Sequence, residues 1–252
     1  MTVERGKGWE MHLGDCLEVM ATLEKVDHVI TDPPYEAEAH KHASRSPKPG
    51  QHVNNYAIPF NAITEEQRAA VAAECGRLAA SWALVFCQLE GVNPWRDALV
   101  SAGGKWRRAA VWVKPDSAPQ FTGDRWAQSF ECIGSAWFGK GKSTWNGGGR
   151  RAVFTHCVNS FGRLTNGRPH PTQKPDALMI ELVGLFSGEG ETILDPYAGS
   201  ASTGVACLRL GRKFIGIEKD PTYFALACER LRAEEQGSTL QAARVGQLPL
   251  LG

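Results

Sequence analysis

The sequence predicts an α/β protein built on a doubly wound, mostly parallel β-sheet, and three observations support this. Short apolar segments rich in β-branched residues alternate with segments of helical length along most of the 252 residues. Such alternation is typical of strands joined by helices that cover both faces of one sheet. Acids end three of the predicted strands, at Asp32, Asp195 and Glu218. Since sheets of this class bind ligands at the carboxyl ends of their strands, these acids predict a shared cleft.

The first half of the chain supplies most of the predicted strands. Asp15 is the expected cap of a helix that follows a strand at 10–13, and the apolar segment HVIT (28–31) is a buried strand. Thr64 and Gln67 have the capping-box spacing, which predicts a helix N-terminus. The further expected elements of this half are a helix at 64–80, a strand at 82–88, a helix at 94–102, and strands at 109–114 and 132–138.

The second half begins with an irregular stretch. Residues 139–169 have no periodicity and are rich in glycine and basic residues, so we assign them to a small inserted region, 115–168. The polar, proline-containing loop 36–60 is long enough to be functional, and we expect it to be mobile, with a loose tail at 237–252. The remaining expected elements are a helix at 175–187, a strand ending at Asp195, a helix at 202–210, a strand at 213–219 and a helix at 221–235.

Composition indicates one domain, residues 1–252, around one large core, because 42% of the residues are hydrophobic. No run of about 18 apolar residues predicts a membrane span, and the opening MTVERGKGWE contains no apolar signal region. The seven cysteines are scattered without the spacing of a zinc site. We therefore expect reduced thiols, no metal and a cytoplasmic location.

Charge is concentrated in one segment although the whole chain has a net charge of only +1. Residues 101–170 carry 11 basic and 3 acidic side chains and are also rich in tryptophan and glycine. A basic stretch with interleaved aromatic residues favours a polyanion, nucleic acid above all, as the partner. The alternative is a solvated surface on which the charges cluster by chance.

The stretch VITDPPY (29–35) places an acid, two prolines and an aromatic ring at the end of a buried strand. Proline donates no backbone N–H, so the carbonyls here are free to accept a hydrogen bond from a ligand. An acid, a carbonyl and a flat ring held rigidly together can bind a planar amino group. The alternative is an ordinary turn.

The segment ILDPYAGSASTGVACLRLGRKFIGIEKD (193–220) has the pattern of a nucleoside site. A strand ends at Asp195, a Gly/Ser turn leads into a helix, and the next strand ends at Glu218, where a carboxylate can accept from both ribose hydroxyls. The GxGxxG pattern of dinucleotide sites is absent, which favours a smaller nucleoside ligand. The alternative is a βαβ unit without a ligand.

Three motifs occur together, DPPY at 32–35, HPTQKP at 170–175 and DPYAGSAST at 195–203. In this combination the chain resembles the DNA amino-methyltransferases (adenine-N6 and cytosine-N4), specifically the beta group, in which DPPY precedes the cofactor motif. The resemblance covers roughly residues 11–35, 82–114 and 168–235. It implies the Rossmann-like fold of S-adenosylmethionine-dependent methyltransferases, with circularly permuted motif order.

The resemblance also implies the cofactor, S-adenosyl-L-methionine, and the residues that bind it. It assigns the methionine end to Asp195, Tyr197, Gly199 and Ser200, and the ribose to Glu218. It places Asp15 at the adenine amino group and His170, Thr172 and Lys174 beside the methionine carboxylate, and the remaining residues of the cofactor site are Cys16 and Lys219. Ala201 departs from the family, which usually has glycine there, and a positive φ at this alanine would cost about 1 kcal/mol.

By the same resemblance Asp32, Pro33, Pro34 and Tyr35 are the catalytic residues. An exocyclic amino nitrogen is a poor nucleophile because its lone pair is delocalised into the ring. Hydrogen bonds to Asp32 and to the Pro33 carbonyl would localise that pair for an in-line methyl transfer, while Tyr35 stacks on a base flipped out of the duplex. An acid at the first motif position favours adenine N6, with cytosine N4 as the alternative. Cytosine C5 chemistry is not expected, since the sequence has no Pro-Cys pair.

Duplex DNA is the expected partner, and the region 115–168 with the loop 36–60 is expected to recognise the target, the loop closing over the flipped base. Trp126 and Trp145 are assigned to packing, with DNA contact as the alternative. An RNA adenine methyltransferase and a catalytically inert binding protein remain as other functions, and a homodimer is the candidate assembly. The basic residues proposed to contact DNA are Arg125, Lys140, Lys142, Arg150, Arg151, Arg163 and Arg168.

Overall fold

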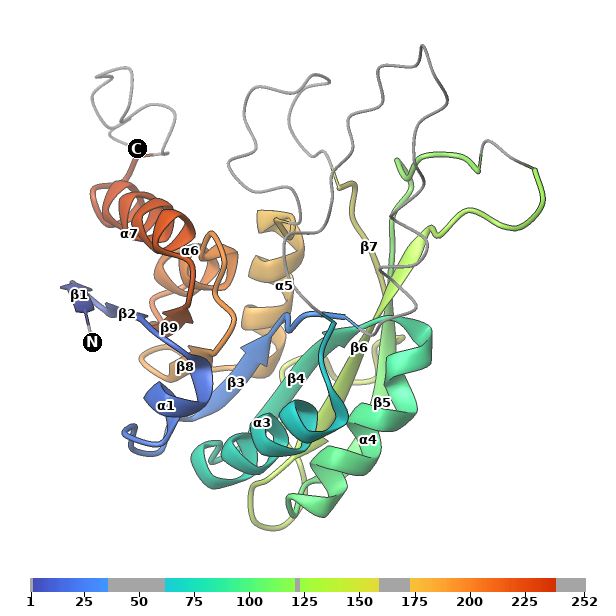
Figure 1. The fold of residues 1–252 in the computed structure, drawn as a ribbon, viewed down its shortest axis with the longest axis horizontal. Coiled ribbons are helices and arrows are strands. Elements are labelled where there is room, and N and C mark those ends of the chain that lie inside the picture. The colour runs from blue at the N-terminus through green and yellow to red at the C-terminus, as the bar shows by residue number, and fades with distance from the viewer. Residues whose placement is uncertain (1, 36–61, 121–122, 159–172, 239–252) are drawn as a thin grey trace.

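The fold is organised around one mixed sheet that crosses the whole molecule (Figure 1). The computed structural model describes residues 2–35, 62–120, 123–158 and 173–238, and the loop 36–60 and most of the tail 237–252 lie outside this range. Within it the sheet has nine strands in the order β1-β2-β9-β8-β3-β4-β6-β5-β7. The strands are β1 (Thr2–Gly6), β2 (Trp9–Leu13), β3 (His28–Thr31), β4 (Trp82–Cys87), β5 (Lys105–Val113), β6 (Phe130–Trp137), β7 (Val153–Thr155), β8 (Thr192–Asp195) and β9 (Lys213–Glu218).

The central strands β2, β9, β8, β3 and β4 are parallel, as the alternation of strands and helices predicts. β6 runs antiparallel to both β4 and β5, β7 is parallel to β5, and β1 is antiparallel to β2. The α/β class and the mostly parallel sheet are therefore confirmed. The short edge strands β1 and β7 are additions that the sequence did not predict.

Helices cover both faces of the sheet (Figure 1). In the described residues they are α1 (Cys16–Met20), α3 (Glu65–Leu78), α4 (Val92–Ser101), α5 (Asp176–Phe186), α6 (Ser202–Arg209), α7 (Pro221–Glu235) and a 3₁₀ turn at Leu89–Gly91. α1, α3 and α4 lie on one face, and α5, α6 and α7 on the other. β4 shows why both faces need a cover. Its residues 82, 84 and 86 pack under α5, and residues 83, 85 and 87 pack on the side of α3 and α4.

Local sequence determines where these helices begin. The Asp15 carboxylate accepts from the backbone of Leu17, which starts α1 directly after β2. Thr64 and Gln67 form the predicted capping box of α3. Side-chain oxygens at these positions satisfy backbone donors that have no partner inside the helix. The caps therefore set the points at which the chain leaves the carboxyl edge of the sheet.

The predicted inserted region, 115–168, is not separate from the sheet. It contains β6, an interior strand, and β7, which pairs with β5. The parts of it that lie outside the sheet, in the described residues, are 115–129 and 138–152 together with 156–158. β6, predicted as a strand at 132–138, is buried along most of its length, and the role of this region in target recognition stays a prediction.

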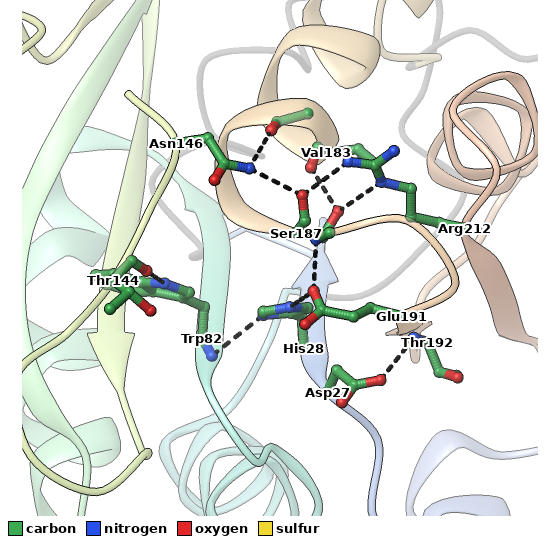
Figure 2. A network of polar contacts seen from close by, with 12 residues as sticks. Asp27, His28, Trp82, Thr144, Asn146, Val183, Ser187, Glu191, Thr192 and Arg212 are labelled. Atoms are coloured by element: carbon green, nitrogen blue, oxygen red, sulfur yellow. Dashed lines mark hydrogen bonds and ion pairs between the residues drawn. The ribbon is translucent and has the colours of Figure 1, made fainter. Parts of the chain in front are cut away.

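A polar network ties the amino edge of the sheet together (Figure 2). His28 lies between Glu191, 2.8 Å from its Nε2, and the backbone N–H of Trp82, 3.4 Å from its Nδ1. Arg212 donates to the carbonyl of Ser187 at 2.8 Å and to its hydroxyl at 3.2 Å. These contacts connect the starts of β3, β4 and β8 with the end of α5. This edge is therefore filled by structural contacts.

Candidate active site

Three acids mark the carboxyl edge of the sheet. Asp32 follows β3, Asp195 ends β8 and Glu218 ends β9, and these strands are neighbours in the order β9-β8-β3. Parallel pairing places all three strand ends at the same edge. The structure thus brings together the acids that the sequence singled out, at the place where α/β sheets bind ligands.

A buried ionic cluster surrounds Asp32. Lys174 donates from Nζ to Asp32 Oδ2 at 2.5 Å and to the Tyr35 hydroxyl at 3.2 Å, and it lies 3.2 Å from Glu131 Oε2. Tyr35 donates its hydroxyl to Glu131 Oε2 at 2.6 Å. Lys114 completes the set with a short ion pair to Glu131. Two carboxylates, two ammonium groups and one phenol therefore form one charge-balanced cluster.

One oxygen of Asp32 has no partner. Lys174 holds Oδ2, whereas Oδ1 is buried and makes no hydrogen bond. A buried acceptor without a donor is costly, so such an atom points to a ligand that supplies the donor. Burial opposes the charge of Lys174, but Asp32 and Glu131 raise its pKa above the ordinary value. The lysine is therefore an ammonium ion, and it fixes the Asp32 carboxylate with Oδ1 open.

Lys174 does not face solvent, since the residue is only 8% exposed, and its predicted place beside the methionine carboxylate stays a prediction. Its direct partners in this structure are the acids Asp32 and Glu131. Glu131 and Lys114 are functional candidates that the sequence reading missed. The available signal was an acid inside the apolar strand FECIGSAW and a lysine at the end of AAVWVK.

Two acids predicted to bind the cofactor are held in place around the turn after β8. Glu218 accepts from the backbone N–H of Gly199 at 2.9 Å and of Asp220 at 2.8 Å. Asp195 accepts from the Thr203 hydroxyl at 2.6 Å, and burial raises the pKa of this acid to about 7. Backbone and hydroxyl donors therefore hold both carboxylates in fixed orientations at the edge of the sheet.

The adenine side of the predicted cofactor site lies beside the same turn. Asp15 caps α1 and its Oδ2 is 3.3 Å from Lys219 Nζ. Cys16 is buried next to Tyr197, and burial raises the pKa of its thiol. Ser200 accepts from the buried Arg230 through its carbonyl at 2.5 Å and its hydroxyl at 3.1 Å. Ser200 is thus tied to α7.

Ala201 has a left-handed backbone with φ 58° and ψ 42°, directly before α6. It is the one residue other than glycine with positive φ in the described part of the chain. The condition under which this departure from the family would cost stability, a positive φ, is therefore met. The strain of about 1 kcal/mol is tolerated because the turn is hydrogen-bonded on both sides of it, by Gly199 to Glu218 and by Ser200 to Arg230.

The chemistry of these residues fits S-adenosylmethionine better than a phosphate ligand. Asp15, Asp195 and Glu218 are acceptors, suited to amino and hydroxyl donors and to a positively charged sulfonium. A phosphate would meet three acids at this edge. His170 and Thr172, the other residues assigned to the cofactor, lie outside the described residues. Nowhere in the described ranges do three or more His, Cys, Asp or Glu residues cluster in a way that could hold a metal ion.

The described residues predicted to contact DNA are spread over different parts of the molecule. Register places Trp137, the last residue of β6, beside Trp82, the first of β4. Because β6 is antiparallel to β4, Lys140 and Lys142, just beyond β6, lie at the amino edge, opposite Asp32. Their contact with DNA stays a prediction.

The other described candidates lie elsewhere. Arg125 is in the segment that joins β5 to β6 at the carboxyl edge, where Val113 pairs with Phe130. Arg150 forms an ion pair with Glu181 of α5, and Arg151 is exposed. Arg163 and Arg168 lie outside the described residues.

The two tryptophans assigned to packing differ. Trp145 packs against Phe186, with ring centroids 5.5 Å apart, as predicted. Trp126 is 94% exposed, so the packing assignment is wrong for this residue. It follows Arg125 directly, so a basic and an aromatic side chain project together from the carboxyl edge.

A sheet of this topology with DPPY at the end of β3 defines the class of amino-methyltransferases, and the family comparison agrees. Residues 26–229 match the N6/N4 family of DNA methylases. Because this match covers most of the chain, the protein belongs to that family. In the part of the chain that the structure describes, no helix is both long and apolar enough to cross a membrane.

Relatives are similar over short segments. Type II methyltransferase M2.DpnII of Streptococcus pneumoniae is 48% identical over 67 residues, which are 27% of this chain and 25% of that protein. DNA adenine methyltransferase YhdJ of Escherichia coli (strain K12) is 42% identical over 76 residues, 30% of this chain and 26% of that protein. The similarity thus spans about a quarter of each relative's length.

Solved structures are similar over most of the chain. The M1.HpyAVI–SAM complex has a TM-score of 0.66 and 27% identity, covering 88% of this chain and 98% of that one. The cytosine-N4-specific PvuII DNA methyltransferase has a TM-score of 0.64 at 16% identity, covering 88% of this chain and 85% of that one. The second comparison shows a common fold only.

Proposed function

We propose that this protein is an S-adenosylmethionine-dependent DNA methyltransferase that modifies the exocyclic N6 amino group of adenine in duplex DNA. The observation that carries the proposal is the unpartnered Oδ1 of Asp32, beside an Oδ2 that Lys174 holds. The family match and the M1.HpyAVI–SAM neighbour support the cofactor. When bound, S-adenosylmethionine supplies an electrophilic methyl group.

The residues of the DPPY segment prepare the amino group. Asp32 Oδ1 accepts one N–H of the target and the Pro33 carbonyl accepts the other, which localises the nitrogen lone pair. Pro34 keeps the segment rigid, since its ring fixes φ. Tyr35 stacks on the base, a contact that contributes about 1–3 kcal/mol. The amine loses a proton after transfer, and the nearest free acceptor for it is Asp32 Oδ1.

Adenine is favoured over cytosine by the acid at the first motif position and by the similarity to an enzyme named as a DNA adenine methyltransferase. Cytosine N4 remains the second candidate, because its amino group can make the same two hydrogen bonds. An inert binding protein is disfavoured because the catalytic residues Asp32 and Tyr35 are both present and both accept a hydrogen bond from Lys174. An RNA substrate is disfavoured because the sequence shows no RNA-binding module.

Duplex DNA hides the amino group inside the base stack, so the adenine must be flipped out to reach Asp32. Arg125 and the exposed Trp126, on the segment between β5 and β6, are the described residues best placed to contact DNA beside the flipped base. We keep the homodimer as a candidate assembly that size measurements in solution would test.

A transfer assay tests the proposal. The purified protein is incubated with methyl-labelled S-adenosylmethionine and either unmethylated genomic DNA or, in parallel, cellular RNA, and each nucleic acid is digested to nucleosides and separated. The expected product is N6-methyladenine. Label in N4-methylcytosine would transfer the proposal to the second candidate, label in RNA alone would favour the RNA enzyme, and no label in either with cofactor bound would support an inert binding protein.

A further inference from the structure

Glu131 occupies a position in β6 that the strand pattern assigns to the core. It faces the same side of the sheet as Ile133 and Trp137, both buried under α5, and pairs in register with the buried Trp112. The residue is 9% exposed. A carboxylate at such a position is unfavourable unless its charge is paired, so its presence calls for a functional explanation.

The carboxylate of Glu131 has three partners, and each belongs to the catalytic edge. It accepts from the Tyr35 hydroxyl at 2.6 Å, lies 3.2 Å from Lys174 Nζ and forms a short ion pair with Lys114. Burial alone would raise the pKa of Glu131, but Lys174 and Lys114 lower it to about 2. Glu131 is therefore ionised, and both lysines favour its charge.

Two of these contacts hold residues of the DPPY segment in place, Tyr35 directly and Asp32 through Lys174. The hydrogen bond from Tyr35 to Glu131 fixes the far end of the ring, and the ring centroid lies 5.5 Å from Lys174 Nζ. A ring that is held at its hydroxyl as well as at its Cα cannot swing away from the base.

Lys174 is shared between the two acids, 2.5 Å from Asp32 Oδ2 and 3.2 Å from Glu131 Oε2. The attraction of Glu131 keeps the ammonium group at the Oδ2 side of Asp32. Oδ1 of Asp32 therefore stays available as an acceptor.

We propose that Glu131 is a positioning residue of the methyl-transfer site, which orients the Tyr35 ring through its hydroxyl and keeps Lys174 on the far oxygen of Asp32, with Lys114 as its counter-ion. The inference rests on the proposed function and adds a residue from β6 that lies almost 100 positions from the DPPY motif. It explains why a buried acid and a buried lysine stand at the ends of adjacent strands.

The first test uses the pKa of Asp32, which needs no DNA. Burial raises the pKa of Asp32, Lys174 opposes this, and the charge of Glu131 raises that pKa further. The isosteric substitution Glu131→Gln removes that charge, so carbon-13 NMR of the Asp32 carboxyl should show a lower pKa than in the wild type. The matched control is Glu234→Gln. It neutralises an acid on α7 that is paired with Arg209 of α6, and it should leave the Asp32 pKa unchanged. An Asp32 pKa unaffected by Glu131→Gln would overturn the inference.

The second test uses single-turnover methyl transfer to genomic DNA. Glu131→Ala should slow transfer by about 100-fold, the cost of a misplaced reacting group. Calorimetry with S-adenosylhomocysteine should give a Kd equal to that of the wild type. Because Tyr35→Phe already removes the hydroxyl that Glu131 holds, Tyr35→Phe combined with Glu131→Gln should be less impaired than the product of the two single losses.

The outcomes separate this inference from the proposed function. If the wild type transfers label to no nucleic acid while Glu131→Gln lowers the Asp32 pKa, the proposed function is refuted and the electrostatic role of Glu131 stands. An active wild type with Glu131→Ala within twofold of its rate would refute the positioning role alone. If Glu131→Ala transfers slowly and its cofactor affinity falls by the same factor, Glu131 supports the structure as a whole, and the positioning role is likewise refuted. If Glu131→Ala does not fold, the transfer rate and the Asp32 pKa of Glu131→Gln decide whether Glu131 has the positioning role.

Discussion

At the scale of single residues, this site depends on how buried charges are paired. Asp32 could be predicted from the sequence because the DPPY motif is contiguous. Its partners could not, because Lys174 and Glu131 reach it only through the tertiary fold. A lysine beside two acids remains charged where it is buried, and this ion holds one oxygen of Asp32 while leaving the other open.

Glu218→Ala should weaken cofactor binding. The carboxylate is already oriented by the backbone of Gly199 and Asp220, so it can accept ribose hydroxyls without further ordering. Each charged hydrogen bond lost should cost about 1.5–3 kcal/mol. Calorimetry with S-adenosylhomocysteine measures the loss, and an unchanged Kd would rule out the ribose role. The matched control Glu191→Gln removes an acid at the opposite edge and should leave that Kd alone.

Asp195 should make the stability depend on pH. Burial raises its pKa in the folded protein from the ordinary value of 3.8 to about 7. The folded state therefore holds a proton that the unfolded chain releases between these values. This residue's contribution to the free energy of unfolding is fully present below about pH 4 and is lost as pH rises through 7, at up to about 1.4 kcal/mol per unit.

The substitution Asp195→Asn should remove this dependence. Urea unfolding at several pH values would show the wild type losing stability relative to Asp195→Asn between about pH 4 and pH 7. The exposed acid Asp97 provides the control, and Asp97→Asn should follow the wild-type curve. Parallel curves for wild type and Asp195→Asn would show that Asp195 is ionised over the whole range.

At the scale of elements, the sequence predicted helices better than strand directions. Caps such as Thr64 with Gln67 are local, so the start of α3 could be predicted to the residue. The antiparallel direction of β6 is set by its neighbours β4 and β5, which no local pattern shows. The edge strands β1 and β7 are short, and only their pairing with β2 and β5 identifies them as strands, so their composition did not predict them.

Two helical glycines should respond oppositely to alanine. At Gly184 in α5 a Cβ would meet only Leu210 at 3.7 Å, so Gly184→Ala should stabilise the protein by up to about 1 kcal/mol through helix propensity. At Gly204 in α6 it would lie 2.6 Å from Phe214 and 2.8 Å from Leu231. Gly204→Ala should therefore destabilise by about 1–3 kcal/mol through overpacking. Urea unfolding compares the two, and equal effects would contradict the close approach of α6 to the sheet.

At the scale of the whole molecule, the basic segment 101–170 is divided by the fold. Lys140 and Lys142 lie at the amino edge, Lys114 is buried in the catalytic cluster, and Arg125 lies at the carboxyl edge. Counting charges along the chain correctly identified a basic segment. It could not predict that the antiparallel direction of β6 would place Lys140 and Lys142 on the far side of the sheet.

This division predicts which charges contribute to DNA binding. Replacing Arg125 by Gln should lower the slope of log K against log salt by up to about 0.9, the value per phosphate contact. Replacing Lys140 by Gln changes the net charge equally but should leave the slope at the wild-type value. Fluorescence anisotropy with duplex DNA over a salt series compares the two variants. A larger effect from the lysine variant would place the DNA at the amino edge instead.

The central claim is that Asp32 at the carboxyl edge of the sheet directs a methyl group to the amino group of adenine in DNA. Modified-base sequencing of DNA from cells that express the wild type or Asp32→Ala tests it most directly. The account predicts N6-methyladenine within one short recognition sequence for the wild type and none for a folded Asp32→Ala protein that still binds cofactor. Equal methylation by both proteins, or no modified base in DNA from cells with folded wild type, would contradict it.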